Sequence, residues 1–267
     1  ESSAELGAFL AFCLRRDRQR AIDRGCSVEE LRGVGCTPDD LKAVGFSAAE
    51  LRASNYSSSQ LKSAGYPLAE LQRVGYTLAD LAVAQFSATE LRAVGYSSQE
   101  LRDEGFTAGE LKRAAFAVRE LRAAGYAPYE MRDADYSVSQ LSNSGYGAVE
   151  LRDGGYSASQ LKQAGFSAAE MRAANYTAGE LRAAGLNSAV ALKTAGFTAA
   201  ELREARYNAA QAKAAGFTLG ELKQAFYTAA QLKTAGFVLS DFKSIGCAPA
   251  ELREAGYFSV QLRASGY

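Results

Sequence analysis

Histidine is absent from this chain of 267 residues. Its absence removes the commonest general base of enzymes and the side chain that most often binds transition metals. Carboxylates are numerous, but they recur at one repeated position and form no unique pair suited to acid–base catalysis. The sequence also lacks a glycine-rich phosphate-binding loop and a dinucleotide-binding fingerprint. It therefore predicts a protein that is not an enzyme, with no catalytic, cofactor-binding or metal-binding residues.

Net charge is also lacking, because 30 Lys and Arg residues balance 30 Asp and Glu residues. A balanced chain has no overall electrostatic attraction to DNA or RNA, so we expect no nucleic-acid partner. Long apolar runs are missing too. The longest, residues 6–14, is far shorter than the roughly 20 residues that a membrane-spanning helix requires. No transmembrane segment is expected, whereas peripheral membrane contact stays open.

Cysteine is scarce, with four residues. Cys26, Cys36 and Cys247 stand where most repeats carry an aromatic residue, and we interpret them as small buried apolar substitutes. Cys26 and Cys36 are one repeat apart and could form a disulfide in an oxidising compartment, so cysteine usage leaves the compartment open. The chain begins with Glu1 rather than Met, which allows a cleaved organellar targeting segment, for example plastid, or secretion. The localisation stays unknown.

The most informative feature that is present is a ten-residue unit, approximately Ser-x-x-Glu-Leu-Arg-x-x-Gly-Tyr, which recurs over residues 27–267. Its leucine returns every tenth residue over 31–181, slips by one residue, and returns again over 192–262, giving about 24 units. A unit this short cannot bury its apolar side alone, so tandem units stack into a solenoid. We expect each unit to contact mainly the units before and after it.

Both ends of the unit carry helix signals. Ser47 is a suitable N-cap, and Glu50, three residues later, completes a capping box. Glycine usually precedes the aromatic residue, where a helix ends with a left-handed residue. Asn55, Asn175 and Asp135 replace that glycine, and these residue types tolerate the left-handed conformation best. The unit is therefore predicted to be a capped helix of about seven residues.

Proline placement agrees with this prediction. Pro38, Pro128 and Pro249 fall at the first helical position, where proline is tolerated, and Pro67 falls at the cap itself. We therefore predict an all-α, elongated solenoid of about 24 stacked short helices. Its core is formed by the leucine, the small residue three positions later and the aromatic residue.

Three segments are expected along the chain. Residues 1–26 form an N-terminal capping helix, residues 27–186 form a regular decapeptide-repeat array, and residues 187–267 form a second repeat segment after the register slip.

A β-helix is the alternative fold. Leucine and an aromatic residue alternate every five residues, and in this the array resembles the pentapeptide-repeat proteins, which implies a right-handed quadrilateral β-helix. Those proteins need a small residue two positions before each central apolar residue, where this chain has Arg119 and Tyr129. We favour the short-helix solenoid because capping and proline placement agree on it.

Breaks in the pattern supply the candidate interaction residues. One group is the N-terminal arginine cluster, which could contact phosphates or anionic lipid headgroups. The other candidates are the two residues at the register slip, two residues further along the chain that replace the usual glycine, and the last aromatic residue. The candidates are Arg15, Arg16, Arg18, Arg20, Leu186, Asn187, Arg206, Phe226 and Tyr267.

An extended surface of near-identical units is typical of scaffolds. We therefore predict a non-enzymatic structural or protein-interaction scaffold, an accessory or linker subunit of a larger assembly. Its partners are other proteins or further copies of itself, held through the array ends or surface. A self-associating filament or extracellular structural protein is one alternative, and phosphate or lipid-headgroup binding through the N-terminal arginines is another.

Overall fold

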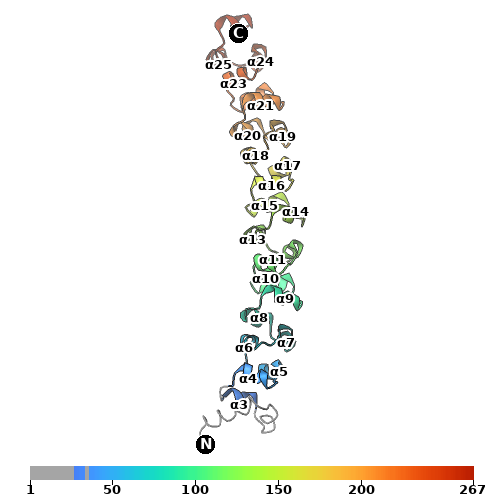
Figure 1. The fold of residues 1–267 in the computed structure, drawn as a ribbon. Helices are drawn as coiled ribbons and strands as arrows, with labels where there is room; N and C mark the ends of the chain where they lie inside the picture. The colour runs from blue at the N-terminus through green and yellow to red at the C-terminus, as the bar shows by residue number, and fades with distance from the viewer. Residues whose placement is uncertain (1–26, 34–35) are drawn as a thin grey trace. The chain divides into compact units, whose positions relative to one another are not determined.

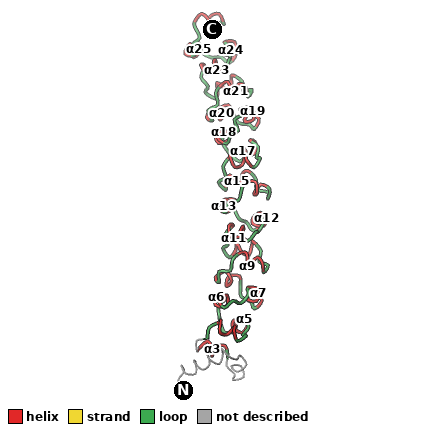
Figure 2. Tube along the Cα trace, viewed as in Figure 1, coloured by secondary structure: helices red, strands yellow, loops and turns green. Residues whose placement is uncertain are grey.

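The computed structural model describes residues 27–33 and 36–267, and these fall into two units, one ending at Tyr126 and one spanning Ala127–Tyr267. Within the described residues the regular elements are short helices and no strand occurs (Figure 2). The all-α prediction is therefore confirmed, and the β-helix alternative is not found. The capping helix predicted for residues 1–26 lies outside the described residues.

Ten of these helices belong to the first unit (Figure 1). They are α3 (Val28–Gly33), α4 (Pro38–Ala43), α5 (Ala48–Ala53), α6 (Ser58–Ser63), α7 (Leu68–Arg73), α8 (Leu78–Val83), α9 (Ala88–Ala93), α10 (Ser98–Asp103), α11 (Ala108–Arg113) and α12 (Val118–Ala123).

The second unit continues the series. Its helices are α13 (Pro128–Asp133), α14 (Val138–Ser142), α15 (Ala148–Asp153), α16 (Ala158–Gln163), α17 (Ala168–Ala173), α18 (Ala178–Ala183), α19 (Ala189–Thr194), α20 (Ala199–Glu204), α21 (Ala209–Ala214), α22 (Leu219–Gln224), α23 (Ala229–Thr234), α24 (Leu239–Ser244), α25 (Pro249–Glu254) and α26 (Ser259–Ala264).

Helix α5 shows how the repeat fixes both ends of a helix. The Ser47 backbone N–H donates to Glu50 Oε2 at 2.7 Å, and the Glu50 N–H donates to Ser47 Oγ at 3.4 Å, which is the predicted capping box. At the other end Asn55 is left-handed, with φ of 59°, and the Tyr56 N–H donates to the Leu51 carbonyl at 3.1 Å. Ser54 is the C-cap, so the helix has six residues rather than the expected seven.

Proline positions match the prediction. Pro38, Pro128 and Pro249 begin helices α4, α13 and α25, and Pro67 is the N-cap of α7. Proline therefore interrupts no helix interior in the part of the chain that the structure describes.

Stacking corrects one expectation about contacts. The closest helix pairs are separated by one helix along the chain, as α6 and α8 are in the first unit, and α18 and α20 in the second. Successive helices therefore alternate between two columns, as α5 to α8 show in Figure 1. The physical repeat is two decapeptides, which we call a rung. One six-residue helix cannot span both sides of the core, so two are needed to enclose it.

The core lies between the two columns. Leucines such as Leu51 and Leu71 are fully buried, and aromatic residues such as Tyr56 and Tyr66 are about 5% exposed or less. The predicted leucine column is thus buried, and the aromatic column is buried in most repeats and half-buried in others, such as those of Tyr96 and Phe237. The small residue three positions after the leucine is buried in some repeats, as at Ala64 and Ala124, and only half-buried in others.

Candidate interaction surface

Basic residues after the leucine join successive rungs. Lys62 Nζ donates to the Ala84 carbonyl at 3.0 Å and to the Gln85 carbonyl at 2.6 Å, and it lies 4.3 Å from the centroid of the Phe86 ring. The same arrangement recurs two decapeptides apart along both units, for example from Arg152 to Ala174. A hydrogen bond from a charged group and a cation–π contact both favour this geometry. These cations therefore hold the stack together.

Tyrosine hydroxyls form hydrogen bonds to the preceding rung, whereas the basic residues bond to the following one. Tyr66 Oη donates to the Phe46 carbonyl at 2.7 Å, and Tyr227 Oη donates to the Tyr207 carbonyl at 2.8 Å, in each case two decapeptides back. Burial, with smaller contributions from Glu70 and Glu50, raises the pKa of Tyr66 to about 12.

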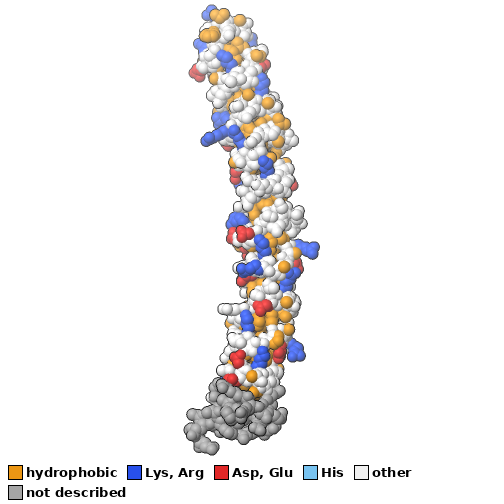
Figure 3. Space-filling model, viewed as in Figure 1, with side chains coloured by type: hydrophobic (Ala, Val, Ile, Leu, Met, Phe, Trp, Pro, Cys, Tyr) orange, Lys and Arg blue, Asp and Glu red, His pale blue; other side chains and the backbone are white. Residues whose placement is uncertain are grey.

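The remaining charges on the visible face are of both signs and interspersed in each unit (Figure 3). The regular surface thus has little that would distinguish one rung from the next.

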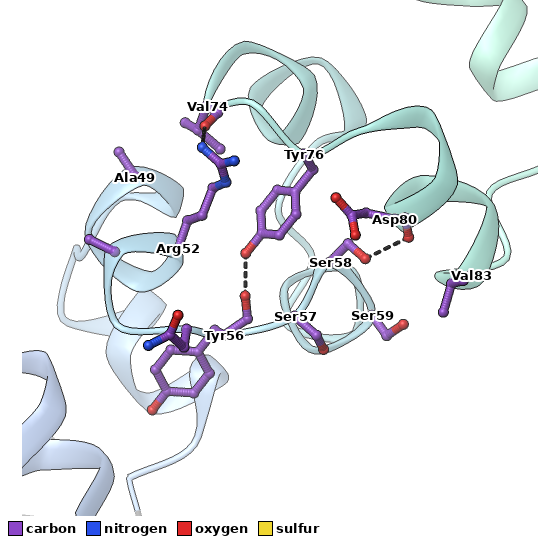
Figure 4. Close-up of a pocket in the computed structure, with 12 residues that line it drawn as sticks. Ala49, Arg52, Tyr56, Ser57, Ser58, Ser59, Val74, Tyr76, Asp80 and Val83 are labelled. Carbon is purple, nitrogen blue, oxygen red and sulfur yellow. Dashed lines mark hydrogen bonds between the residues drawn. The ribbon is translucent and has the colours of Figure 1, made fainter. Parts of the chain in front are cut away.

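A groove lies between successive rungs. The one between α5–α6 and α7–α8, here the Tyr76 groove, has a volume of about 630 Å³. Figure 4 shows the Tyr76 ring in it, with Arg52 reaching the Val74 carbonyl beside the ring and the Tyr76 hydroxyl donating to the Tyr56 carbonyl. The Arg52 guanidinium lies 5.4 Å from the centroid of that ring. Aromatic ring and cation together cover the core in a regular groove.

The register slip leaves this stacking intact. Tyr207 Oη donates to the Leu186 carbonyl at 3.2 Å, across one residue more than in regular rungs, and Arg182 reaches the Ala205 carbonyl at 2.5 Å, again one residue further on. Leu186 is half-buried and Asn187 is exposed. The extra residue is therefore accommodated in the loop before α19, and nothing in this geometry makes the loop a binding site.

Arg206 and Phe226 occupy the left-handed position that glycine usually holds. Both have φ of 63°, a conformation that costs an L-residue with a bulky side chain about 1–2 kcal/mol. Both are exposed, and Phe226 keeps 76% of its surface accessible. They follow α20 and α22, which are adjacent in one column. Two strained, exposed side chains therefore occupy the same position in successive rungs.

Arg203 extends this cluster. Its regular target is the buried aromatic residue of the next rung, Tyr227. Its Nη1 donates to the Phe226 carbonyl at 3.4 Å, the position that Lys62 reaches at Gln85, while its guanidinium carbon lies 5.7 Å from the Phe226 ring centroid. We call Arg203, Arg206 and Phe226 the Phe226 patch. Arginine and aromatic side chains are enriched at the energetically dominant positions of protein interfaces.

A second groove adjoins Phe226, between α22–α23 and α24–α25. This Cys247 groove has a volume of about 520 Å³, and Phe226, Leu232 and Phe242 line it. Cys247 stands where an aromatic ring stands in the Tyr76 groove, and Phe242 replaces the usual leucine of the core. Large and small side chains have thus been exchanged between these two positions. The ring has moved into the core, and a thiol is left at the groove.

Lys223 has lost its ring partner as a result. Its Nζ donates to Cys247 Sγ at 3.1 Å and to Glu251 Oε2 at 2.9 Å. The Glu251 carboxylate first, and the thiol second, raise the pKa of Lys223 above its ordinary value. Both ends of the ion pair are partly solvated, so the pair adds little stability. The cation that covers an aromatic ring elsewhere is held here by an exposed ion pair.

The other sequence candidates are not part of this cluster. Arg15, Arg16, Arg18 and Arg20 lie outside the described residues. Tyr267 is half-buried, and its buried hydroxyl has no hydrogen-bond partner among the residues that the structure describes. Of the candidates, the structure brings only Arg206 and Phe226 together on one face.

Sequence reasoning missed Lys223, Glu251 and Glu254. Cys247 was recognised as a buried substitute in the aromatic column, and it is 4% exposed, but its effect on the groove was not foreseen. The signal was present in the sequence, because a lysine 24 residues before a cysteine matches the spacing of the cation–ring pairs. That spacing has no meaning until the two-column stacking is known.

The rungs define an α-helical repeat protein in which pairs of decapeptides stack. A family model described as "Decapeptide repeat region" matches residues 20–88, 55–128, 115–188 and 216–267, so the chain belongs to this family of decapeptide-repeat proteins. Neither the curated proteins nor the solved structures gave a match. No helix among the described residues is long and apolar enough to cross a membrane, and these residues contain no cluster of potential metal ligands.

Proposed function

We propose that this chain is a non-enzymatic scaffold that binds a protein partner through the Phe226 patch, as an accessory or linker subunit of a larger assembly. The observation that carries the proposal is the exposed, left-handed Phe226. Left-handed bulky residues are strained and persist at functional sites, where the strain is offset by what the side chain does. An apolar ring that is three-quarters exposed gains free energy when a partner covers it.

The repeat architecture supports the same proposal. Stacked rungs present a long, regular surface, and the cations of regular rungs are engaged within the stack, as Lys62 is with Ala84 and Phe86. A departure from that regularity is therefore where specificity for a partner can arise. The alternative of lipid or phosphate binding by the N-terminal arginines concerns residues outside the described part.

Site-specific photo-crosslinking tests this function. Benzoylphenylalanine replaces Phe226 in the full chain, expressed in the cells that produce it, and replaces Gln85 in a matched control. Gln85 occupies the same position of its repeat, is exposed and has φ of 59°. A discrete crosslinked protein is expected at 226 and not at 85. Crosslinks to a second copy of the chain would instead support the self-association alternative, and equal yields at both positions would contradict the proposal.

A further inference from the structure

We propose that the Cys247 groove receives an aromatic side chain from a polypeptide partner, which takes the place that the repeat's own ring takes in regular grooves. This inference rests on the proposed function and specifies the chemistry of its partner.

The chemistry of the occupant is given by the regular grooves. Tyr76 lies beneath Arg52, and Phe217 lies beneath Lys193 at 4.4 Å from Nζ to the ring centroid. In the Cys247 groove the cation remains, as Lys223, but the ring at its position does not. An incoming phenyl or phenol ring would regain the cation–π contact.

Apolar side chains line the Cys247 groove. Phe226 stands at the groove with most of its ring accessible, and Leu232 and Phe242 line its inner side. Within the described residues, the lining of the Tyr76 groove includes no member of the leucine column. A volume of about 520 Å³ lies within the range of ordinary ligand pockets and holds one aromatic side chain with its flanking backbone. Offset or edge contact with the Phe226 ring would add to the burial.

Charges on either side orient the partner. Arg206 is exposed in the rung before Phe226, and Glu254 is exposed on α25 at the other side of the groove, beside Glu251, which pairs with Lys223. A segment that crosses from α20 towards α25 therefore meets positive charge, then an apolar site, then negative charge. Complementarity predicts an acidic residue, an aromatic residue and a basic residue in that order along the stack.

The first experiment uses p-cresol, the side-chain analogue of tyrosine, as the probe. Saturable binding to the full chain is measured by nuclear magnetic resonance, with shifts expected at Phe226, Lys223 and Cys247. The double variant F242L/C247Y restores the regular residues at both exchanged positions, so it should keep its helical spectrum and lose at least 10-fold in affinity. Absence of saturable binding to the unaltered chain, or equal affinity of the double variant, would overturn the inference.

Introducing the same exchange of residues into a regular groove tests the inference by a gain of binding, which misfolding cannot produce. L81F/F86C introduces the same exchange away from the Cys247 groove, beneath Lys62, which now lies 4.3 Å from the Phe86 ring. It should create a second p-cresol site. If F242L/C247Y is not helical, Phe226→Ala replaces it, because alanine is accepted at that position in Ala115, and it should lower affinity at least threefold. Unchanged affinity in Phe226→Ala would contradict the inference.

Orientation is tested with two peptides, acetyl-Asp-Gly-Phe-Gly-Lys-amide and its charge-exchanged form. The first should bind at least threefold more tightly, and the preference should disappear in Arg206→Gln. Equal binding of the two peptides would overturn the assigned orientation. Failure of p-cresol alongside a specific crosslink at 226 would remove this inference and leave the scaffold function standing, whereas failure of both would remove both.

Discussion

The Tyr76 groove and the Cys247 groove are built from the same positions of the repeat and differ in what covers the core. In the first, the Tyr76 ring lines the groove and the Arg52 guanidinium lies over it. In the second, the ring has moved into the core as Phe242, and Lys223 is held by Glu251 and a thiol. The comparison shows that the stack accommodates the aromatic ring either at the groove or in the core.

The largest expected effect comes from raising the pH, which acts on buried tyrosines throughout the array. The folded state raises the pKa of Tyr66 and Tyr156 to about 12, chiefly by burial. Folding therefore favours the neutral hydroxyl, so this contribution is complete below about pH 10 and is lost as the pH rises through about 12. Near the Cys247 groove the aromatic residues at 217 and 237 are phenylalanines and Tyr227 lies between them, so fewer hydroxyls titrate there than over residues 56–76.

Amide hydrogen exchange at rising pH checks this prediction. Helices α5–α7, which carry the Tyr56, Tyr66 and Tyr76 hydroxyl bonds, should open before α21–α23. Opening of α21–α23 first would contradict the role given to the hydroxyls.

Leu71→Asp should be the most damaging single substitution of those compared. Leu71 is fully buried in the regular region, and an unpaired carboxylate there should cost more than about 4 kcal/mol in the free energy of unfolding. Circular dichroism during thermal melting provides the measurement. Leu71→Met is the control, and it should lose less than about 1.5 kcal/mol because methionine already fills this column at Met131.

Removing the charge of Lys62, which lies over an aromatic ring, and that of Lys223, which does not, should have different effects on stability. Lys62→Met loses two carbonyl hydrogen bonds and a cation–π contact, and should cost about 1–3 kcal/mol in unfolding free energy. Lys223→Met loses only a partly solvated ion pair and a thiol contact, and should cost less than about 1 kcal/mol. Denaturant titration distinguishes the two. Equal losses would mean that the carbonyl bonds and ring contact of Lys62 stabilise the fold no more than the ion pair and thiol contact of Lys223.

The smallest effects are expected at the left-handed position, with opposite signs in the two regions. Gly95→Val should destabilise by about 1 kcal/mol or more, because Gly95 has φ of 100°, which a β-branched residue adopts poorly. No atom lies within 4 Å of an added Cβ, so the loss reports backbone strain rather than a steric clash. Gly95→Asn should be milder. Phe226→Gly should stabilise by up to about 1 kcal/mol while weakening partner binding. A destabilised Phe226→Gly variant would show that Phe226 supports the fold rather than a partner.

Local structure could be predicted from the sequence because its causes lie within ten residues. Ser47 with Glu50 defines where a helix begins, and Asn55 defines where it ends. The two-column stacking could not be predicted, because its determinants act over 20 or more residues, as in the bonds of Lys62 and Tyr66. Of the candidate site, Arg206 and Phe226 stood out as breaks in a column. Lys223 and Glu251 did not, because each is ordinary at its own position.

Spacing the contacts two decapeptides apart has a mechanical consequence. Within each unit, a rung is bonded to the next by bonds such as that of Tyr66 to Phe46, 20 residues apart. A rung is therefore the smallest piece that can detach without breaking only part of the bonds to its neighbour. Under tension from an end, one rung should release about 20 residues, or about 70 Å of extended chain, before the next yields. A chain pulled in an optical trap should therefore lengthen in steps of that size, and act as an extensible tether that recoils one rung at a time.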